Sequence, residues 1–461
     1  MKRCIVALCV CLCAHALFAS GVENKTNLST GYLRNPSRNT ENQRPEAAFY
    51  NIAGTAFLKD GLWIEGGNQF VFKEYGNELK TNNKYAAYGI YDYYSNDETT
   101  VWLYPDFDIV YKKNRWATFL TFGVYAGGGS LQYSEGTSAT TMLFLGGANK
   151  LKDAATLYGN AARAAVLSNP TLAAAYNAKM TEYKNAAGAS QKMAQSHSLD
   201  VTSITYGGQI GAAYKVLDWL SLSAAYRYTI GTQEMSLTCN DITFVMVNGG
   251  KEISYDAVGF GQSCVFGIHA KPPAIPALDL SLQYQTLSRI DYDVSHVKGK
   301  LAQYYDITND TKFRTDLPAV LNVGVGYSVF DNLYLSAGFN WYFNNFADQN
   351  SILSETDYKN SWEIAFGVDW HFCKYAGLSA GVSYGKQGIT DTSNSTFNPV
   401  LDNIVYGVGV ELYPVHDLTI TLSCLYANYF DADYYLEGNK TTLSKDVTNL
   451  GIGLTYHFSG L

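Results

Sequence analysis

The sequence predicts an all-β transmembrane barrel of fourteen antiparallel strands, and three observations lead to this fold class. Apolar side chains alternate with small or polar ones along runs of about ten residues, the length that a tilted strand needs to cross a bilayer. Short turns join these runs into hairpins. The chain has 37 tyrosines and 41 glycines but only 16% charged residues, a composition typical of barrels with aromatic side chains at the membrane interfaces.

The segment 317–346 is the clearest hairpin. Apolar residues at every second position from Leu317 to Val329 alternate with asparagine, glycine and serine, and the run Leu333 to Phe343 repeats the pattern after a turn at 330–332. A period of two indicates strands. The second face of each strand is small or polar, so it is not the face of a buried core. This segment is therefore predicted to be a transmembrane hairpin.

The same pattern recurs around six short turns, at residues 111–116, 214–219, 270–273, 330–332, 372–375 and 413–417. Six turns join twelve strands, and one further run precedes them (62–75) and one follows (447–458), which gives fourteen. An even number suits a closed barrel, in which no strand edge faces lipid. The other connections are long and polar, and they are expected at 77–98, 135–199, 232–257, 293–316, 347–360, 386–402 and 430–445.

The N-terminus has the features of a secretory signal. Lys2 and Arg3 precede an apolar run that ends in small residues near Ala19, so residues 1–20 are predicted to be a signal peptide. The barrel is then expected over 61–461, in the bacterial outer membrane after secretion to the periplasm. The aromatic Phe458 near the end of the last strand fits recognition by the barrel-assembly machinery, which is the expected protein partner.

Several classes of function are excluded by composition and motifs. The net charge of −8 and the lack of a basic stripe argue against nucleic acid. No histidine lies in a GxSxG or HExxH setting and no phosphate-binding GxxxxGK[ST] occurs, so neither an enzyme nor a cofactor is expected. The mature cysteines form no CxxC pair, so we expect no metal site and no disulfide framework; they are Cys239, Cys264, Cys373 and Cys424.

Residues 21–60 do not have the pattern of a strand. A polar half is followed by an apolar half, which reads AAFYNIAGTAFLKDG over residues 47–61. Such a segment is a flexible tail, a structural linker or a plug inside the barrel, and the apolar half favours the plug. The segment 21–60 is therefore expected to be an N-terminal hatch.

The phrase at 47–61 resembles the hatch of the FadL/TodX outer-membrane transporters of long-chain fatty acids and other hydrophobic compounds. The resemblance extends to the strand number and the signal peptide, and so spans the whole chain. The Asn-Pro-Ala triplet of that family falls on Asn51, Ile52 and Ala53, followed by Gly54. Ile52 departs from the family, because it replaces a proline that would make the backbone rigid.

The third strand runs into three consecutive glycines, Gly127, Gly128 and Gly129. Glycines in a strand permit a bulge or a kink. The resemblance implies that an inward kink here opens a lateral gap through which the ligand leaves into the membrane lipid. The alternative is that these glycines simply begin the following loop.

The following loop, 135–199, is expected to be helical and extracellular. Its apolar residues recur at helical spacing, and Asn169-Pro170 is typical of a second helix start. We expect two amphipathic helices that bury their stripes against the barrel. The resemblance implies a ligand-capturing groove lined by residues such as Leu151, Tyr158, Leu172 and Tyr176, whereas packing alone is the alternative reading.

Charged residues on the lumen-facing phase of the strands are candidate polar anchors. Arg227 is the one cation among them, and it is the candidate partner for a ligand carboxylate. Most such charges solvate the lumen or tie a plug to the wall; the others are Asp106, Asp108, Glu363, Asp369, His371 and Glu411.

Together these observations lead to a functional hypothesis of passive uptake of long-chain fatty acids or similar hydrophobic compounds. An oily tail gains about 0.8 kcal/mol per buried methylene, so its transport requires apolar sites, a plug against water and an exit toward lipid. The competing interpretations are a general porin and an adhesin-like surface barrel.

Overall fold

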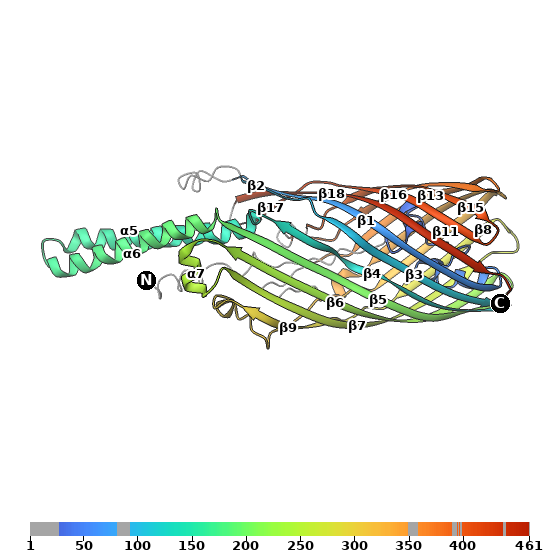
Figure 1. Ribbon diagram of the computed structural model, residues 1–461, viewed down its shortest axis with the longest axis horizontal. Coiled ribbons are helices and arrows are strands. Elements are labelled where there is room, and N and C mark those ends of the chain that lie inside the picture. The colour runs from blue at the N-terminus through green and yellow to red at the C-terminus, as the bar shows by residue number, and fades with distance from the viewer. Residues whose placement is uncertain are drawn as a thin grey trace.

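The computed structural model is a closed antiparallel β-barrel, and it describes residues 27–80, 93–348, 358–389, 394, 396, 399–436 and 439–460 (Figure 1). The predicted signal peptide and residues 21–26 of the predicted hatch lie outside these residues. The strands are β1 (Gly61–Lys80), β2 (Tyr93–Asp97), β3 (Thr100–Lys113), β4 (Trp116–Tyr133), β5 (His197–Leu217), β6 (Leu220–Cys239), β7 (Glu252–Ala270), β8 (Leu278–Gln285), β9 (Asp291–Lys298), β10 (Lys312–Arg314), β11 (Val320–Phe330), β12 (Leu333–Tyr342), β13 (Ser361–Cys373), β14 (Ala376–Lys386), β15 (Asn403–Val415), β16 (Leu418–Tyr429), β17 (Ala432–Leu436) and β18 (Asn439–Phe458).

These segments of the described chain form one sheet of 18 strands that closes where β1 pairs with β18. Four short segments, β2, β9, β10 and β17, continue the lines of β3, β8, β11 and β16 on the same partners. The wall therefore has 14 strand lines, as the sequence predicted. Closure protects the strand edges, whose backbone would otherwise face lipid unpaired.

The two ends of the barrel differ in the length of their connections. All six short turns lie at one end, which we call the turn rim, and their positions match the prediction. The long connections lie at the other end, the loop rim. The predicted loop 232–257 is shorter than expected, because β6 and β7 continue into it and pair there, with Glu234 opposite Asp256. In these stretches the apolar side chains change face, because Met235 and Leu237 are buried inside the barrel whereas Ile230 is exposed on its outside. The outward-facing apolar pattern of the rest of the strand therefore does not continue.

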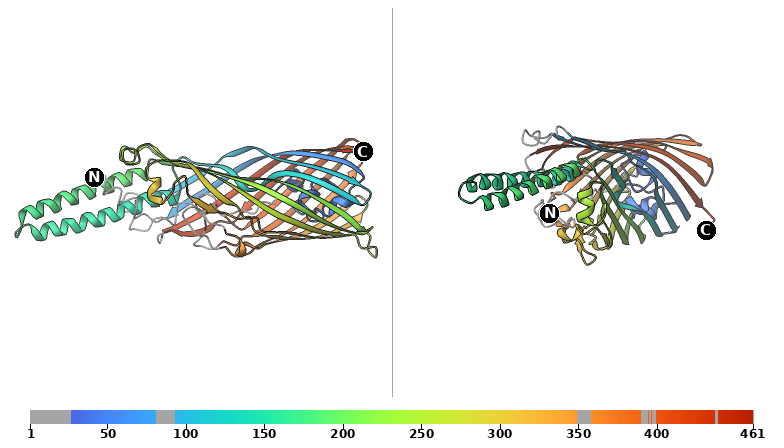
Figure 2. Two further views of the ribbon diagram at one scale, coloured as in Figure 1. Left: turned by 90° about the horizontal axis from the view of Figure 1, so that it is seen from below. Right: turned by 60° about the vertical axis from the view of Figure 1, so that its left-hand side comes forward.

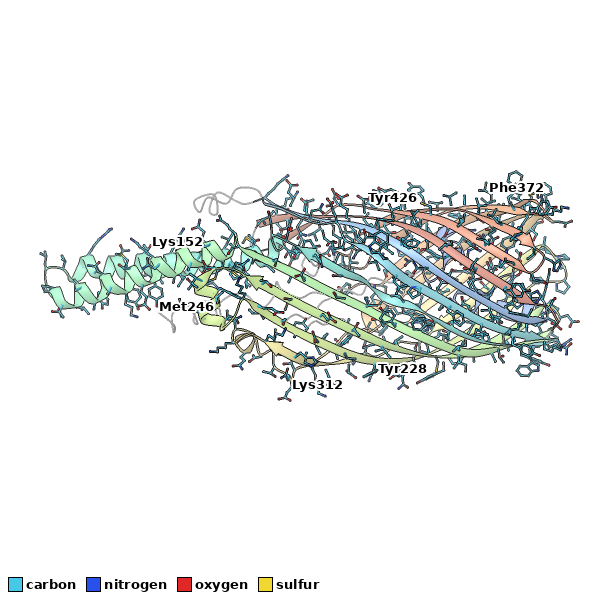
Figure 3. The ribbon with its side chains drawn as sticks, viewed as in Figure 1. Lys152, Tyr228, Met246, Lys312, Phe372 and Tyr426 are labelled. Atoms are coloured by element: carbon cyan, nitrogen blue, oxygen red, sulfur yellow. The ribbon has the colours of Figure 1, made fainter. Side chains whose placement is uncertain are left out.

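The wall has an apolar exterior and a polar interior. Along β18, Ile452 and Leu454 are 46% and 52% exposed, whereas the intervening lumen-facing residues are glycines. Tyr228 and Tyr426 likewise project outward from the wall, in agreement with their exposure (Figure 3). A water-soluble barrel has a polar exterior and an apolar interior, whereas the apolar exterior here is suited to contact with lipid.

The interior of the barrel near the turn rim is filled by residues 27–60, which we call the hatch (Figure 2). The hatch contains α2 (Thr30–Arg34), α3 (Ala47–Tyr50) and the 3-10 helix η1 (Gly54–Phe57). Its apolar half packs on the wall, where Ile52 and Ala56 join a buried cluster with Trp63 and Phe119. The buried core therefore lies inside the barrel.

Two long helices form a hairpin that projects from the loop rim (Figure 1). They are α5 (Ser138–Ala165) and α6 (Pro170–Met193), and a short helix α7 (Ile242–Asn248) lies in a neighbouring loop, with 3-10 turns η2 (Ala302–Tyr305) and η3 (Asn344–Phe346) further along. Asn169 caps α6 and Pro170 is its first residue, as predicted. Among the described residues, no helix is both long and apolar enough to span a membrane.

Candidate functional site

Ion pairs hold the hatch to the wall on the side of the turn rim. The Arg34 guanidinium lies 2.5 Å from the Asp369 carboxylate on β13. Arg44 lies 3.0 Å from Glu411 on β15. Removing one partner of a buried ion pair costs about 3–5 kcal/mol, because the other charge is left uncompensated. Asp369 and Glu411 were predicted to face the lumen, and the structure gives both of them hatch partners.

We expect Asp369→Ala to loosen the hatch. The substitution removes a carboxylate that Arg34 shares with Arg38, whose guanidinium lies 3.3 Å from it, while each arginine keeps a glutamate partner. The lost charged hydrogen bond weakens hatch docking by about 1.5–3 kcal/mol. The measurement is single-channel conductance in planar bilayers, which should rise. Asp402→Ala is the control, because it removes an ion pair with Lys386 near the loop rim, away from the hatch. Equal conductance of the two variants would contradict the latch role of Asp369.

The segment Asn51–Gly54 is a tight contact between hatch and wall. The Asn51 side-chain amide lies 2.8 Å from Nδ1 of His269, and the Ser221 hydroxyl donates to the Ala53 carbonyl at 2.7 Å. Gly54 has no room for a side chain, since a Cβ would meet the Asn51 amide. Ile52 is fully buried, and its backbone N–H donates to Oε1 of Gln283 at 2.9 Å. A proline at position 52 has no hydrogen to donate.

We expect Ile52→Pro to weaken hatch docking by about 1–3 kcal/mol, because Gln283 then loses its donor inside the barrel. Hydrogen exchange of residues 47–57 is the measurement, and it should become faster. Ile52→Val is the matched control, because it keeps the N–H and most of the apolar volume. Unchanged exchange in the proline variant would show that this hydrogen bond contributes nothing to docking.

Backbone pairing between β3 and β4 stops beside the three glycines of β4, and we call this unpaired stretch of the wall the opening. The pairing of β3 with β4 ends at Phe107 and Phe122, although β3 continues along β1 as far as Thr100. Beyond that point β4 stays paired with β5 through two register shifts, and Gly127 and Gly129 adopt φ values of 86° and 80°. These left-handed conformations require glycine. The glycines therefore belong to a kinked strand and not to the start of the loop.

Side chains close the opening toward the loop rim. The Lys73 ammonium donates to the carbonyls of Gly128 at 2.9 Å and Ser130 at 2.5 Å. The Thr99 hydroxyl also donates to the Ser130 carbonyl, at 2.8 Å. The unpaired stretch thus lies between the last β3–β4 backbone pair and these side-chain contacts. Gly128 lies at its inner edge, where a Cβ would have the Tyr75 hydroxyl as its nearest neighbour, at 3.6 Å.

A small cavity of about 80 Å³ lies between this opening and the top of the hatch. Its lining includes Gly127 and Gly128 from β4, Tyr104 from β3 and Tyr32 from the hatch. Aromatic and aliphatic side chains share its lining with several polar side chains, among them the charged Lys73 and Glu363. A ligand with a long tail would therefore have to displace side chains or the hatch to occupy this cavity fully.

A second small cavity, of about 90 Å³, lies on the other side of Tyr32 and Tyr342, which line both. It is bounded by Phe49 of the hatch and Tyr125 of the wall. Arg227 is the only charged side chain among its described lining residues. This cavity therefore combines aromatic walls with a single cation.

Arg227 is buried and forms no ion pair with a described residue. Its guanidinium donates to the Gln209 side-chain carbonyl at 2.7 and 3.0 Å and to that of Gln285, and it lies 4.2 Å from the centre of the Tyr125 ring. These neutral acceptors orient the cation without neutralising it. An anionic group that enters the cavity would meet a pre-oriented partner of opposite charge.

The predicted groove residues of the loop helices lie in the α5–α6 hairpin. The apolar stripes of the two helices face each other and not the barrel, apart from the first turns of α5, which are buried in the barrel mouth. Leu151 is buried, Tyr158 stacks with Tyr183 and contacts Tyr176, and Leu172 is 40% exposed. The structure does not bring these residues near Arg227, and their role in ligand capture stays a prediction.

Several residues that complete the two cavities were not predicted from the sequence. Gln209 and Gln285 have the pattern of ordinary lumen-facing positions, and nothing in the alternation links them to Arg227. Lys73 lies near the end of the predicted first strand, and its position in the alternation, on the lumen-facing side, could have identified it as a lumen residue. Tyr32 lies in the polar half of the hatch, and only the fold brings it between the cavities.

Comparisons with known proteins agree with this architecture. A family model described as outer membrane protein transport protein (OMPP1/FadL/TodX) matches residues 155–458. A search of curated proteins finds no match. Among solved structures, a FadL homologue of Pseudomonas aeruginosa is similar with a TM-score of 0.65 at 14% identity, covering 96% of this chain and 99% of that one.

Two toluene transporters are also similar in fold. The Pseudomonas putida toluene transporter TodX has a TM-score of 0.58 at 12% identity, over 92% of this chain and 97% of that one. The Ralstonia pickettii toluene transporter TbuX has a TM-score of 0.53 at 13% identity, over 92% and 98%. These identities establish the shared fold.

Proposed function

The chain belongs to the OMPP1/FadL/TodX family, whose members transport hydrophobic compounds across the bacterial outer membrane, and on this premise we propose that it takes up long-chain fatty acids or similar amphipathic molecules by passive diffusion. The family consists of transport channels and not of enzymes. The observation that carries the finer proposal is Arg227, a buried cation without an ion-pair partner among the described residues, in a cavity lined by aromatic rings.

Arg227 favours a ligand with an acidic head group over a neutral hydrocarbon. A carboxylate gains a charge-assisted hydrogen bond there, worth about 1.5–3 kcal/mol. Toluene, the substrate named for TodX and TbuX, can offer the cation only the face of its ring, which Tyr125 already supplies. The tail gains from the aromatic and aliphatic lining at about 0.8 kcal/mol per methylene. We therefore propose the acid as the ligand class.

We propose that the ligand leaves through the opening between β3 and β4 into membrane lipid. Three features support this route: the end of the β3–β4 pairing, the kink at Gly127–Gly129, and the cavity that reaches both the kink and the hatch. The hatch fills the lumen below this level, so a straight aqueous path to the turn rim is not the favoured one. Ligand capture at the loop rim by the predicted residues Leu151, Tyr158, Leu172 and Tyr176 is the remaining part of the proposal.

The experiment is direct binding followed by uptake. Purified protein in detergent is titrated with a fluorescent long-chain fatty acid, and proteoliposomes are then assayed for its entry and for ion conductance. We expect saturable binding, protein-dependent entry and low conductance. A high conductance without saturable binding would identify a general porin and overturn the proposal. Saturable binding of toluene but not of the acid would retain the family function and overturn the ligand class.

A further inference from the structure

Three carboxylates gather on the lumen side of β1 and β3. The strand register places Glu65 directly opposite Asp108, and Asp106 follows two residues away on the same face of β3. Their exposed fractions are 5%, 0% and 3%, respectively, for Glu65, Asp108 and Asp106. One oxygen atom of each carboxylate lies within 4.8 Å of the corresponding atoms of the other two. The cluster is thus compact and shielded from solvent.

Compensating positive charge at the cluster is weak, because the Arg44 guanidinium attracts Glu65 only from beyond ion-pair distance and is itself paired with Glu411. No described lysine, arginine or histidine forms an ion pair with any of the three carboxylates. The Thr455 hydroxyl donates to Glu65 at 2.7 Å, but neither oxygen of Asp108 has a hydrogen-bond partner. Burying a carboxylate without a partner is costly. These unpartnered oxygens, aimed into the cluster, indicate a missing cationic ligand.

The donor atoms define the type of cation. The cluster offers only oxygen atoms, which hard cations such as Ca²⁺ prefer, and it lacks the nitrogen and sulfur donors typical of zinc. The three oxygens lie within 4.8 Å of one another, which is compatible with one cation between them at calcium–oxygen distances of about 2.3–2.6 Å. Ca²⁺ accepts irregular coordination, whereas Mg²⁺ requires a near-ideal octahedron. We propose that Glu65, Asp106 and Asp108 form a site for a divalent cation, with Ca²⁺ the favoured ion.

The position of this cation site gives it a structural role. Asp108 pairs with Thr121 of β4, next to the last β3–β4 pair at Phe107 and Phe122, where the wall begins to open. On the lumen side, Thr30 of the hatch lies against Gly67 and Asp106. A bound cation would join β1 to β3 at the base of the opening, beside the hatch. The proposal does not depend on which ligand the barrel transports.

The test is refolding of the full chain with and without the ion. Urea-unfolded protein is refolded into detergent in the presence of EDTA or of millimolar Ca²⁺, and bound metal is measured after dialysis. We expect one bound Ca²⁺ per chain and a midpoint of thermal unfolding several degrees higher than in EDTA. A folded protein that retains no Ca²⁺, Mg²⁺ or Mn²⁺ and unfolds at the same temperature in all conditions would overturn the proposal and assign protons to the cluster.

Variants separate this site from general charge effects. Asp108→Asn should lose the bound ion and the thermal response to Ca²⁺. Asp200→Asn, which changes an exposed carboxylate on β5, should retain both. Glu65→Gln serves as the second variant if Asp108→Asn does not refold, and it should also lose the thermal response. Retention of stoichiometric Ca²⁺ by Glu65→Gln and Asp108→Asn alike would place the ion elsewhere and overturn the assignment.

Discussion

Replacing Gly128 by tryptophan is expected to slow uptake of a hydrophobic ligand by about tenfold or more, which corresponds to a barrier raised by about 1.4 kcal/mol. Gly128 borders the cavity at the inner edge of the wall opening, and the nearest atom to an added Cβ is the Tyr75 hydroxyl at 3.6 Å. A small side chain therefore fits, and a large one extends into the path between the cavity and lipid. Initial uptake rate in proteoliposomes is the measurement.

The matched control is Gly128→Ala, which adds a methyl group at an ordinary contact distance and should transport at nearly the rate of the unmodified protein. Binding of the fluorescent ligand at equilibrium should change little in the tryptophan variant, because the Arg227 cavity is separate. Gly127 is unsuitable for this test, since its positive φ makes every side chain strained. Normal uptake by a folded Gly128→Trp variant would show that the ligand leaves by another route.

Replacing Arg227 by glutamine is expected to weaken binding of a long-chain acid by about 10- to 150-fold, equivalent to the loss of about 1.5–3 kcal/mol from a charged hydrogen bond. The methyl ester of the same acid should bind equally well to both proteins, because it carries no charge. Acid and ester are titrated against each protein, and the ratio of their dissociation constants is the measurement.

Two controls locate the effect. Arg115→Gln removes an exposed cation at the turn rim and should leave the ratio unchanged. Lys73→Met removes the cation of the neighbouring cavity, and it tests whether the head group binds there instead. If Lys73→Met abolishes the preference for the acid and Arg227→Gln does not, Arg227 is not the carboxylate partner.

Most of the barrel could be predicted from the sequence because the bilayer imposes a strict pattern on it. Apolar residues at every second position, as in β11 and β12, identify the membrane-crossing part of each strand and its lipid-facing side. This outward-facing apolar pattern does not continue to the loop rim in every strand. The parts of β6 and β7 near the loop rim are paired strands whose apolar residues, such as Met235 and Tyr255, face inward, so the outward apolar pattern did not extend there and a loop was predicted.

The candidate site could be predicted only in part. Arg227 could be identified from its lumen-facing position in the alternation, and the glycines of β4 from their occurrence as three consecutive residues. Both signals lie within a single strand. The neighbours of Arg227 come from other strands, and so do the partners of Asp106 and Asp108. Glu65 joins those two carboxylates through the β1–β3 register, which depends on pairing between distant segments. The expectation that the chain has no metal site rested on its cysteines and did not include this oxygen cluster.

The ion pairs of the hatch have a consequence for biogenesis. Arg34 and Arg44 are translated early, whereas Asp369 and Glu411 follow 335 and 367 residues later. Contacts of such high sequence separation form slowly, because a long loop must be ordered first. The hatch is thus among the last segments to be seated fully, and a chain that stops before the final hairpins lacks the carboxylates with which Arg34 and Arg44 pair.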